Sequence, residues 1–310
     1  MPRFETKDNT VRDKQTGLMW PRNAALSEFP LAWDEAFSFI REQNHLGLYG
    51  YNDWKLPNRR EMYSLIDLET INPSLPPDHP FVDVFNGYYW TSTSCARLPD
   101  QAWYIHLGGA RVFKGMKYNA YMIWPVRLAD TGGSTIASTG QRHCYDPTGN
   151  VIYCLNTGQD AEYRSGWQPP GPRFTTTGDT VDDNATGLTW LRNADLIAAP
   201  LDWQTAFNAV ADLNRQAFSG FNDWRVPHID ELEGLVDLGR HSPALPERHP
   251  FVDVKDFYWS ATSSRYDRDY AWALYARDGI IGVGYKTLPE FHLWPVRGEV
   301  NGRPAPIYRP

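Results

Sequence analysis

The 310-residue chain lacks several features that would assign it to a common functional class. No apolar run approaches the ~18 to 20 residues that a membrane-spanning helix requires. No run of Lys or Arg appears, and the net charge is −7. We therefore expect no membrane span and no nucleic-acid partner, because nucleic-acid affinity depends on neutralising phosphates with basic residues.

Motifs of catalysis are also missing. The sequence holds no Gly-x-Ser-x-Gly string, no His-Glu-x-x-His string and no phosphate-cradling loop. His79 and His249 recur at equivalent places, but each stands alone before a proline, which is more typical of a structural hydrogen-bonding residue than of a base. The sequence therefore predicts a protein that is not an enzyme and that needs no cofactor.

Only three cysteines are present. Cys144 and Cys154 flank a turn-rich segment, and their separation of 10 residues across a hairpin suits a small disulfide loop. The alternative is a pair of free thiols in a cytosolic protein. A zinc site is disfavoured because only His143 lies close by. Cys95 has no counterpart and is expected to be an unpaired thiol.

The chain contains a long internal repeat, in which equivalent motifs are separated by 170 residues. Asn52 to Pro57 returns as Asn222 to Pro227, and Trp124 to Arg127 returns as Trp294 to Arg297. Solenoid repeats span only roughly 20 to 50 residues, so the sequence predicts two duplicated domains. We assign residues 1–130 to the first repeat, 131–171 to a linker, 172–300 to the second repeat and 301–310 to a tail.

The first half of each repeat is expected to hold a short strand and two helices. In the first copy the strand covers 9–12, and the apolar residues from Trp33 to Ile40 recur at i, i+3, i+4 and i+7, which is typical of a helix. Asn58 and Glu61 have the spacing of a capping box that begins a second helix running through Ile66. His228 replaces the capping asparagine in the second copy and predicts a weaker cap.

The second half of each repeat has the pattern of β-structure, with four runs separated by turn residues. In the first copy these runs cover 88–93, 101–107, 110–114 and 121–127. The fold class is therefore α+β, with two helices packed on a mainly antiparallel sheet, and the layer rule places both helices on one side of it.

Five ordered motifs carry a resemblance to a known family. Thr-Gly-Leu-x-Trp, Trp-x-x-Ala-Phe, Asn-Asp-Trp-Lys/Arg-Leu/Val-Pro, Tyr-Trp-Ser/Thr and Trp-Pro-Val-Arg occur in this order in both repeats. Together they resemble the Lcl C-terminal domain family of bacteria, long of unknown function. The resemblance implies a C-type-lectin-like fold, related to formylglycine-generating-enzyme-like domains, on secreted or surface proteins. In the namesake protein the domain is associated with adhesion to sulfated polysaccharides.

Formylglycine-generating enzymes need an active-site cysteine pair, and neither repeat holds two cysteines, which leaves such chemistry unsupported. The acidic residues Asp53 and Asp223 stand in a string similar to a lectin calcium motif, but they precede the second helix. We expect them to be scaffold residues, which either accept hydrogen bonds from backbone N–H groups of their loop or pair with Arg127 and Arg297. Calcium has two further candidate turns, Asp182-Asp183-Asn184 and Asp267-Arg268-Asp269, for which the alternative is ordinary solvated residues.

Alternation along the strands separates core residues from candidate ligand-binding residues. Trp103, Ile105 and Leu107 are expected to face the core, as are Trp272, Leu274 and Ala276. Exposed aromatic and basic residues near loops that differ between the copies are candidates for recognition. These candidates are Tyr104, His106, Arg111, Lys114, Lys117 and Tyr118 in the first repeat, and Tyr266, Arg268, Tyr275, Arg277 and Lys286 in the second.

Arg111, Lys114, Lys117 and Tyr118 are close in sequence and predict a basic and aromatic patch that suits sulfate or carboxylate groups on a polysaccharide. The alternative is ordinary solvated surface. We therefore expect a secreted or surface-displayed, adhesin-like protein that binds a glycan through the β-rich face of each repeat, with the two repeats engaging one polymer. The competing hypothesis is a structural or protein-binding module of a surface assembly.

Overall fold

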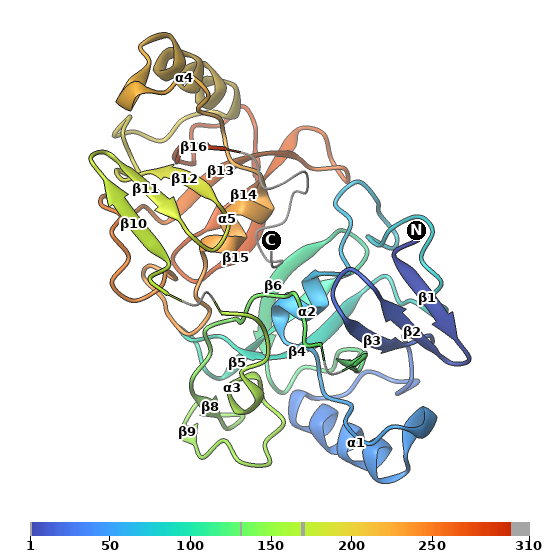
Figure 1. The fold of residues 1–310 in the computed structure, drawn as a ribbon. Coiled ribbons are helices and arrows are strands. Elements are labelled where there is room, and N and C mark those ends of the chain that lie inside the picture. The colour runs from blue at the N-terminus through green and yellow to red at the C-terminus, as the bar shows by residue number, and fades with distance from the viewer. Residues whose placement is uncertain (1, 131, 169–170, 299–310) are drawn as a thin grey trace. The chain divides into compact units, whose positions relative to one another are not determined.

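The computed structural model describes residues 2–130, 132–168 and 171–298. The chain divides into two compact units, residues 1–167 and 168–310, and each is considered by itself (Figure 1). The predicted tail, 301–310, lies outside the described residues.

The first unit contains two antiparallel sheets. A four-stranded sheet has the order β1-β2-β3-β7, and a second sheet pairs β4 with β5 and β5 with β6. The strands of the first sheet are β1 (Phe4–Lys7), β2 (Thr10–Asp13), β3 (Leu18–Pro21) and β7 (Arg127–Leu128). The strands of the second sheet are β4 (Tyr88–Ser94), β5 (Gln101–His106) and β6 (Arg111–Met116).

Both predicted helices of the first repeat are present. Helix α1 (Trp33–His45) has the expected buried stripe of Trp33, Ala36, Phe37 and Ile40. Helix α2 (Arg59–Tyr63) begins with the predicted capping box, because Asn58 Oδ1 accepts from Glu61 N–H at 2.9 Å and the Glu61 carboxylate accepts from Asn58 N–H at 2.8 Å. The helix ends at Tyr63 rather than Ile66, after which single turn bonds continue.

The two helices pack on opposite faces of the β4-β5-β6 sheet, which differs from the predicted single layer. Ala102 lies in the core cluster built on α1, whereas the next residue, Trp103, lies beneath the Arg59 guanidinium of α2 at 4.3 Å. Successive strand residues point to opposite faces, so both faces are covered. The predicted strand over 121–127 is wrong: this segment makes only isolated bridges before β7, including one from Tyr121 to Leu31.

The second unit repeats the same elements. Its four-stranded sheet, β10-β11-β12-β16, contains β10 (Phe174–Thr177), β11 (Thr180–Asp183), β12 (Leu188–Leu191) and β16 (Val296–Arg297). Its second sheet contains β13 (Phe257–Ser263), β14 (Tyr270–Tyr275) and β15 (Ile280–Tyr285). The helices are α4 (Trp203–Arg215) and α5 (Ile229–Leu235). At the start of α5 the His228 side chain makes no cap bond, as predicted, although Glu231 still accepts from His228 N–H.

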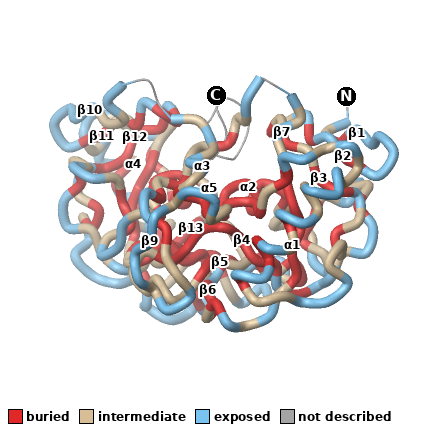
Figure 2. The backbone as a smooth tube through the Cα atoms, turned by 90° about the horizontal axis from the view of Figure 1, so that it is seen from below, coloured by how far each residue is buried: buried red, intermediate tan, exposed pale blue. Residues whose placement is uncertain are grey.

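Tryptophans form much of both cores, and the strands β4 and β5 are lined with buried residues (Figure 2). Three indole N–H groups in each repeat donate to main-chain carbonyls far away in sequence. In the first repeat, Trp33 donates to Thr91 at 2.8 Å and Trp124 donates to Pro21 at 3.0 Å. These bonds hold the helix against the sheet and the end of the repeat against its beginning.

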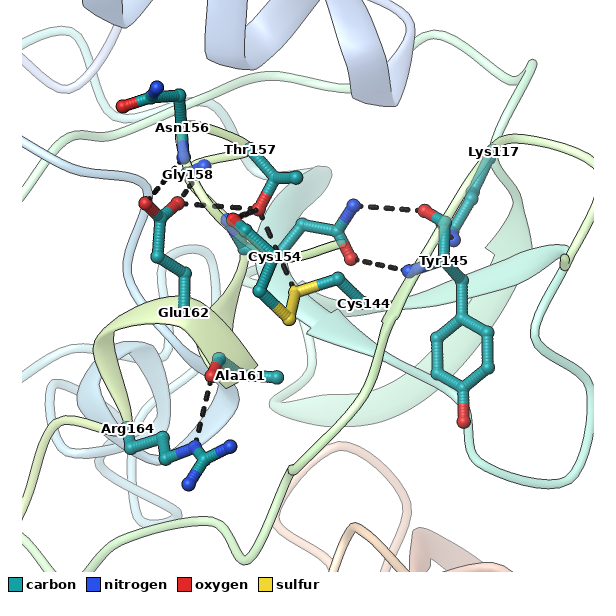
Figure 3. The surroundings of a disulfide bond; sticks show 11 residues. Lys117, Cys144, Tyr145, Cys154, Asn156, Thr157, Gly158, Ala161, Glu162 and Arg164 are labelled. Atoms are coloured by element: carbon teal, nitrogen blue, oxygen red, sulfur yellow. Dashed lines mark hydrogen bonds between the residues drawn. A yellow bond between two sulfur atoms is a disulfide. The ribbon is translucent and has the colours of Figure 1, made fainter. Parts of the chain in front are cut away.

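The connector between the repeats packs on the first unit, which is why that unit extends to residue 167. It contains the hairpin β8 (Cys144–Tyr145) and β9 (Val151–Ile152) and the short helix α3 (Asp160–Tyr163). Cys144 and Cys154 form the predicted disulfide (Figure 3), and Cys95 is a buried free thiol.

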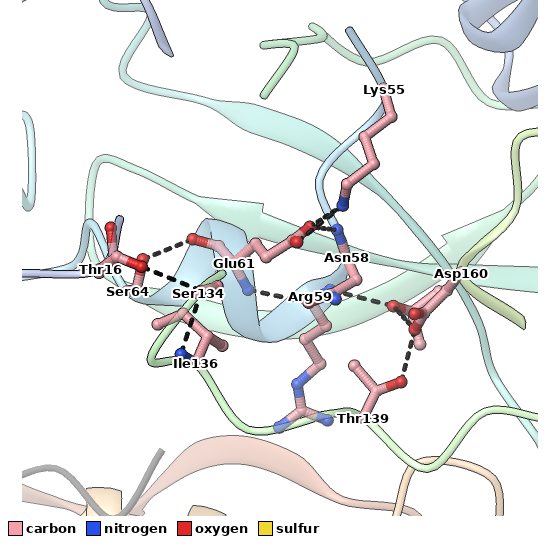
Figure 4. Close-up of polar contacts among 11 residues, drawn as sticks. Thr16, Lys55, Asn58, Arg59, Glu61, Ser64, Ser134, Ile136, Thr139 and Asp160 are labelled. Carbon is pink, nitrogen blue, oxygen red and sulfur yellow. Dashed lines mark hydrogen bonds and ion pairs between the residues drawn. The ribbon is translucent and has the colours of Figure 1, made fainter. Parts of the chain in front are cut away.

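One buried carboxylate fastens the connector to the first repeat. Asp160 of α3 accepts hydrogen bonds from the hydroxyls of Thr93 on β4 and Thr139, both at 2.7 Å (Figure 4). Burial raises the pKa of Asp160 to about 6, and nearby Glu61 adds to the rise, while the two hydroxyls and Lys55 oppose it. The folded protein therefore binds a proton here more tightly than the unfolded chain does.

This shift predicts a pH dependence of stability. Because the folded pKa lies above the unfolded one, the free energy of unfolding should increase as the pH falls from about 7 to about 5, by on the order of 1 kcal/mol from this group. The full gain, on the order of 3 kcal/mol, is reached only below the unfolded pKa of about 4. Asp160→Asn should remove that increment in urea titrations across this range. Asp202→Asn, which removes the charge of the α4 N-cap residue whose pKa is lowered by Thr205, should leave the increment in place. Identical pH profiles for Asp160→Asn and the parent would contradict this account.

The two acid–base pairs expected from the sequence, Asp53 with Arg127 and Asp223 with Arg297, are present in the structure. Arg127 Nε lies 2.6 Å from Asp53 and Arg297 Nε lies 2.7 Å from Asp223, and each guanidinium also covers an aromatic ring. The Arg297 hydrogen bond lowers the pKa of Asp223.

Asp223→Asn should therefore lower the free energy of unfolding at neutral pH by less than about 1 kcal/mol, because the pair is half exposed. The loss should vanish as the pH falls through the folded pKa of Asp223. Calcium should shift the unfolding midpoint of the parent and the variant equally. A calcium-dependent stabilisation that only the parent shows would assign the carboxylate to a metal site instead.

Candidate functional site

Three strands of the first unit bring one set of side chains onto a common face. Tyr88 lies opposite His106, Tyr104 opposite Phe113, and His106 opposite Arg111 in the strand register. Paired residues share a face of the sheet. We call this surface the aromatic face; it consists of Tyr88, Tyr104, His106, Arg111, Phe113 and Tyr121.

The sixth member, Tyr121, comes from the loop after β6 and lies at the centre of the rings. Its ring centroid is 5.0 Å from that of Tyr104 and 5.1 Å from that of Tyr88. Tyr88 contacts Tyr104 at 5.1 Å and His106 at 4.9 Å. Gly115 permits this packing, because a Cβ there would lie 2.8 Å from the Tyr121 hydroxyl.

Helix α1 covers only one end of this face. At that end Trp90 and Ala102 are fully buried in the α1 cluster. At the other end Tyr88 and Phe113 are each 43% exposed, Arg111 is exposed, and the rings between them are half-buried. The prediction that Tyr104 and His106 lie on the face opposite the buried Trp103, Ile105 and Leu107 is confirmed, although both are partly covered.

The electrostatics leave one formal charge on the face at neutral pH. Burial raises the pKa of Tyr104 to about 12, with Tyr121 and Tyr88 adding to the rise and Arg111 opposing it. Burial and then Arg111 lower the pKa of His106. Tyr104 and His106 are therefore neutral at this pH, and the Arg111 guanidinium supplies the charge.

This combination can bind a flat, partly apolar ring that carries an anionic group. Ring faces stack on apolar surfaces, a neutral imidazole and phenol hydroxyls exchange hydrogen bonds with hydroxyl groups, and a guanidinium binds sulfate or carboxylate in a bidentate manner. The arrangement offers no nucleophile and base in contact.

Two of the predicted basic residues are not part of this face. Lys114 is 8% exposed and lies on the opposite side of β6, with its Nζ 5.7 Å from the Trp103 ring. Lys117 is 1% exposed, lies 4.1 Å above the Trp33 ring, and donates to the carbonyl oxygen of Asp146 at 3.1 Å. Burial lowers the pKa of Lys117 to about 7. The predicted exposed patch of Arg111, Lys114 and Lys117 is therefore wrong, because strand alternation separates the first two and a tryptophan covers the third.

The second repeat does not reproduce the aromatic face. Its register places Ala273 at the position of Tyr104, Gly282 at that of Phe113, and the buried Ile280 at that of Arg111. Tyr275 replaces His106 and packs against Phe257 at 5.0 Å and Phe291 at 5.8 Å. The scaffold and a smaller group of three rings are shared, but the Tyr104 and Phe113 rings and the cation occur only in the first repeat.

The remaining predicted residues are scattered. Tyr118 and Tyr266 are 74% and 64% exposed at loop positions. Lys286 lies 4.4 Å above Trp203, as Lys117 does above Trp33, and donates to the carbonyl oxygen of Arg268 at 2.7 Å. Arg268 is exposed and Arg277 is half-buried. None of these contacts gathers the second-repeat residues into one surface.

The candidate calcium turns use their oxygens within the fold. Asp183 is 1% exposed and pairs with Arg173 at 2.9 Å, and Asp182 accepts from the Thr189 hydroxyl at 2.7 Å. Asp267 accepts from Asp269 N–H. Within 2–130, 132–168 and 171–298, no group of three or more His, Cys, Asp and Glu is arranged to hold a metal ion, and no helix there is long and apolar enough to cross a bilayer.

The recurring histidines differ from their prediction. His79 and His249 stack on Phe81 and Phe251 with ring centroids 5.9 Å apart, and burial lowers the pKa of each. Their Nδ1 atoms are buried without a hydrogen-bond partner among the described residues. They contribute to packing rather than to hydrogen bonding through that atom.

Sequence reasoning missed Tyr88, Phe113 and Tyr121. Alternation along β4 places Tyr88 on the same face as Trp90, and alternation along β6 places Phe113 on the same face as Arg111. This part of the pattern could be predicted from the sequence. Their meeting depends on the register between strands, which a single-strand pattern does not contain. Tyr121 belongs to a loop and gives no periodic signal.

The comparison with protein families agrees with this structure. A model of the Lcl C-terminal domain matches residues 9–127 and 179–297, which together cover more than half of the chain. No curated protein matches the chain. The two matched segments coincide with the two repeated scaffolds. The chain belongs to the Lcl C-terminal domain family and carries two tandem copies of that domain.

Proposed function

We propose that this protein is a noncatalytic binding protein, secreted or displayed on the cell surface, that recognises an acidic polysaccharide through the aromatic face of its first repeat. The observation that carries the proposal is the set of contiguous, partly exposed rings with Arg111 at its edge. The second repeat keeps the scaffold and three rings, as Phe257, Tyr275 and Phe291, but has no counterpart of the Tyr104 and Phe113 rings or of the Arg111 cation. Differences on a shared scaffold mark where function resides.

The aromatic face suits a sugar chain better than a deeply buried ligand. Tyr88 and Phe113 present ring surface to solvent, and the half-buried Tyr104 and Tyr121 hold them in place. Stacking of this kind contributes about 1 kcal/mol per ring, and a charge-assisted bond from Arg111 adds about 2 kcal/mol. Such weak sites gain strength when one polymer presents many units.

The disulfide supports the proposed location. Cys144 and Cys154 are joined in a small exposed hairpin, and disulfides persist in oxidising compartments such as the cell exterior.

A second candidate function is protein–protein interaction, favoured by the same hairpin. Val151, Tyr153 and Leu155 are 65%, 83% and 63% exposed on a segment that the disulfide braces. Adjacent exposed apolar residues are typical of an interaction surface. If no polysaccharide binds in a saturable manner, this function takes precedence.

The first test is binding to immobilised dextran sulfate, with unsulfated dextran for comparison. The double variant Arg111→Gln/Phe113→Ala should bind the sulfated polymer about tenfold more weakly or worse, because it loses both the cation and an exposed ring. Tyr118→Ala removes a more exposed tyrosine outside the aromatic face and is the matched control. An unchanged affinity in the double variant, or an equal loss in Tyr118→Ala, would refute the assignment.

The second test uses pH. His106 is neutral at pH 7 because its pKa is lowered, so acidification through this lowered pKa should protonate it beside Arg111 and strengthen binding to the sulfated polymer. His106→Gln should remove this strengthening while keeping the affinity at neutral pH. A binding curve for dextran sulfate that rises equally on acidification in both proteins would show that another group is responsible.

A further inference from the structure

The first unit contains a cavity that is separate from the aromatic face. It has a volume of about 140 Å³ and lies between helix α1, the segment 54–56 and the connector. Its lining changes from the floor to the mouth. Phe37, Ile40, Trp54 and Leu56 are at most 6% exposed and form an apolar floor, whereas Arg41 is exposed and Tyr163 is 49% exposed.

The connector wall of this cavity is held in place by its own bonds. The Glu162 carboxylate accepts from Asn156 N–H at 2.6 Å and from Gly158 N–H at 2.7 Å (Figure 3). The Cys144–Cys154 disulfide closes the preceding hairpin, and Asp160 fastens α3 to β4. The cavity is therefore formed before any ligand arrives, which lowers the entropic cost of binding.

Most polar groups of the lining are already engaged. The Asn44 side chain bonds both the N–H and the carbonyl of Trp54, at 2.9 and 2.7 Å. Lys55 Nζ lies 2.7 Å from the Glu61 carboxylate. A sugar ring placed in the cavity would bury hydroxyls without partners, and each such group costs roughly 1 to 3 kcal/mol. The floor therefore favours an apolar ring.

Arg41 is the exception at the mouth. Among the described residues, its guanidinium bonds only to the Ser38 hydroxyl, at 2.9 Å, and forms no ion pair. It lies near enough to Tyr163 to oppose the rise that burial and Glu162 impose on the pKa of that hydroxyl. A planar guanidinium without a carboxylate partner, beside an apolar floor, is suited to binding a carboxylate.

The second repeat provides an internal comparison. Phe207, Val210, Asn214 and Trp224 keep the floor, but Ala211 stands where the first repeat has Arg41. No connector follows within residues 171–298, so this cavity has no second wall there. The arginine is thus present in the repeat that has the cavity and absent from the repeat that lacks it.

We propose that this cavity binds a small monocarboxylate whose body is a single apolar ring, with the ring on the Phe37–Trp54 floor and the carboxylate on Arg41. A cavity of this size accommodates one six-membered ring, since engineered apolar cavities of roughly 150 Å³ bind benzene. This binding is independent of the polysaccharide function and of the aromatic face.

The test is fluorine NMR of 4-fluorobenzoate with the full chain, with 4-fluorobenzamide as the neutral analogue. Saturable binding with a Kd of about 1 mM is expected for a ligand of this size. Arg41→Gln should weaken binding of the benzoate at least about tenfold, and the benzamide should bind the parent protein as weakly as the benzoate binds the variant. Ile40→Phe, which fills the floor, should abolish binding of both.

Arg215→Gln is the matched control, because it removes an exposed arginine from the corresponding helix of the second repeat, where Arg215 pairs with Asp212. It should leave benzoate binding unchanged, as should Arg111→Gln/Phe113→Ala. No saturable binding, an unchanged affinity in Arg41→Gln, or displacement of the benzoate by glucuronate at equal concentration would overturn the proposal.

Discussion

The structure depends on a set of buried indole N–H bonds to main-chain carbonyls that occurs once in each repeat. An unsatisfied N–H in a core costs roughly 1 to 3 kcal/mol, so each tryptophan fixes both its own position and that of the segment it bonds. Trp33 and Trp90 join the start of α1 to β4, and Trp124 joins the last loop to β3. The equivalent donors in the second repeat are Trp203, Trp259 and Trp294. These residues are the reason that two divergent copies keep one scaffold.

Because the two repeats share one scaffold, the surface residues in which they differ indicate where ligands bind. The first repeat has an aromatic face with one cation, and it carries the connector, which adds the disulfide hairpin and closes a cavity over α1. The second repeat replaces Tyr104 and Phe113 by Ala273 and Gly282. The two domains are therefore similar in fold and unequal in surface chemistry, and the ligand-binding functions proposed for the chain belong to the first domain with its connector.

Features that depend on local spacing could be predicted from the sequence. The Asn58–Glu61 capping box, the α1 stripe and the burial of Trp103 are local patterns, and the disulfide follows from two cysteines across a turn. The Asp223–Arg297 pair was one of two scaffold roles expected for Asp223, and the structure shows it. Strands β1 and β3 were missed because β1 buries only Phe4 and β3, Leu-Met-Trp-Pro, shows no alternation of apolar and polar residues.

Features that depend on which element covers a side chain could not be predicted. Lys114 and Lys117 are charged by type, yet both are buried beside tryptophan rings, because a long aliphatic stem can lie along apolar surface. The Lys117 ammonium also reaches the carbonyl oxygen of Asp146. The most direct test of the central claim is an NMR titration of the full chain with a sulfated oligosaccharide, following backbone amide shifts. The account predicts saturable shifts at Tyr88, Tyr104, Arg111 and Phe113 and none at their second-repeat equivalents; equal shifts in both repeats, or shifts confined to other surfaces, would contradict it.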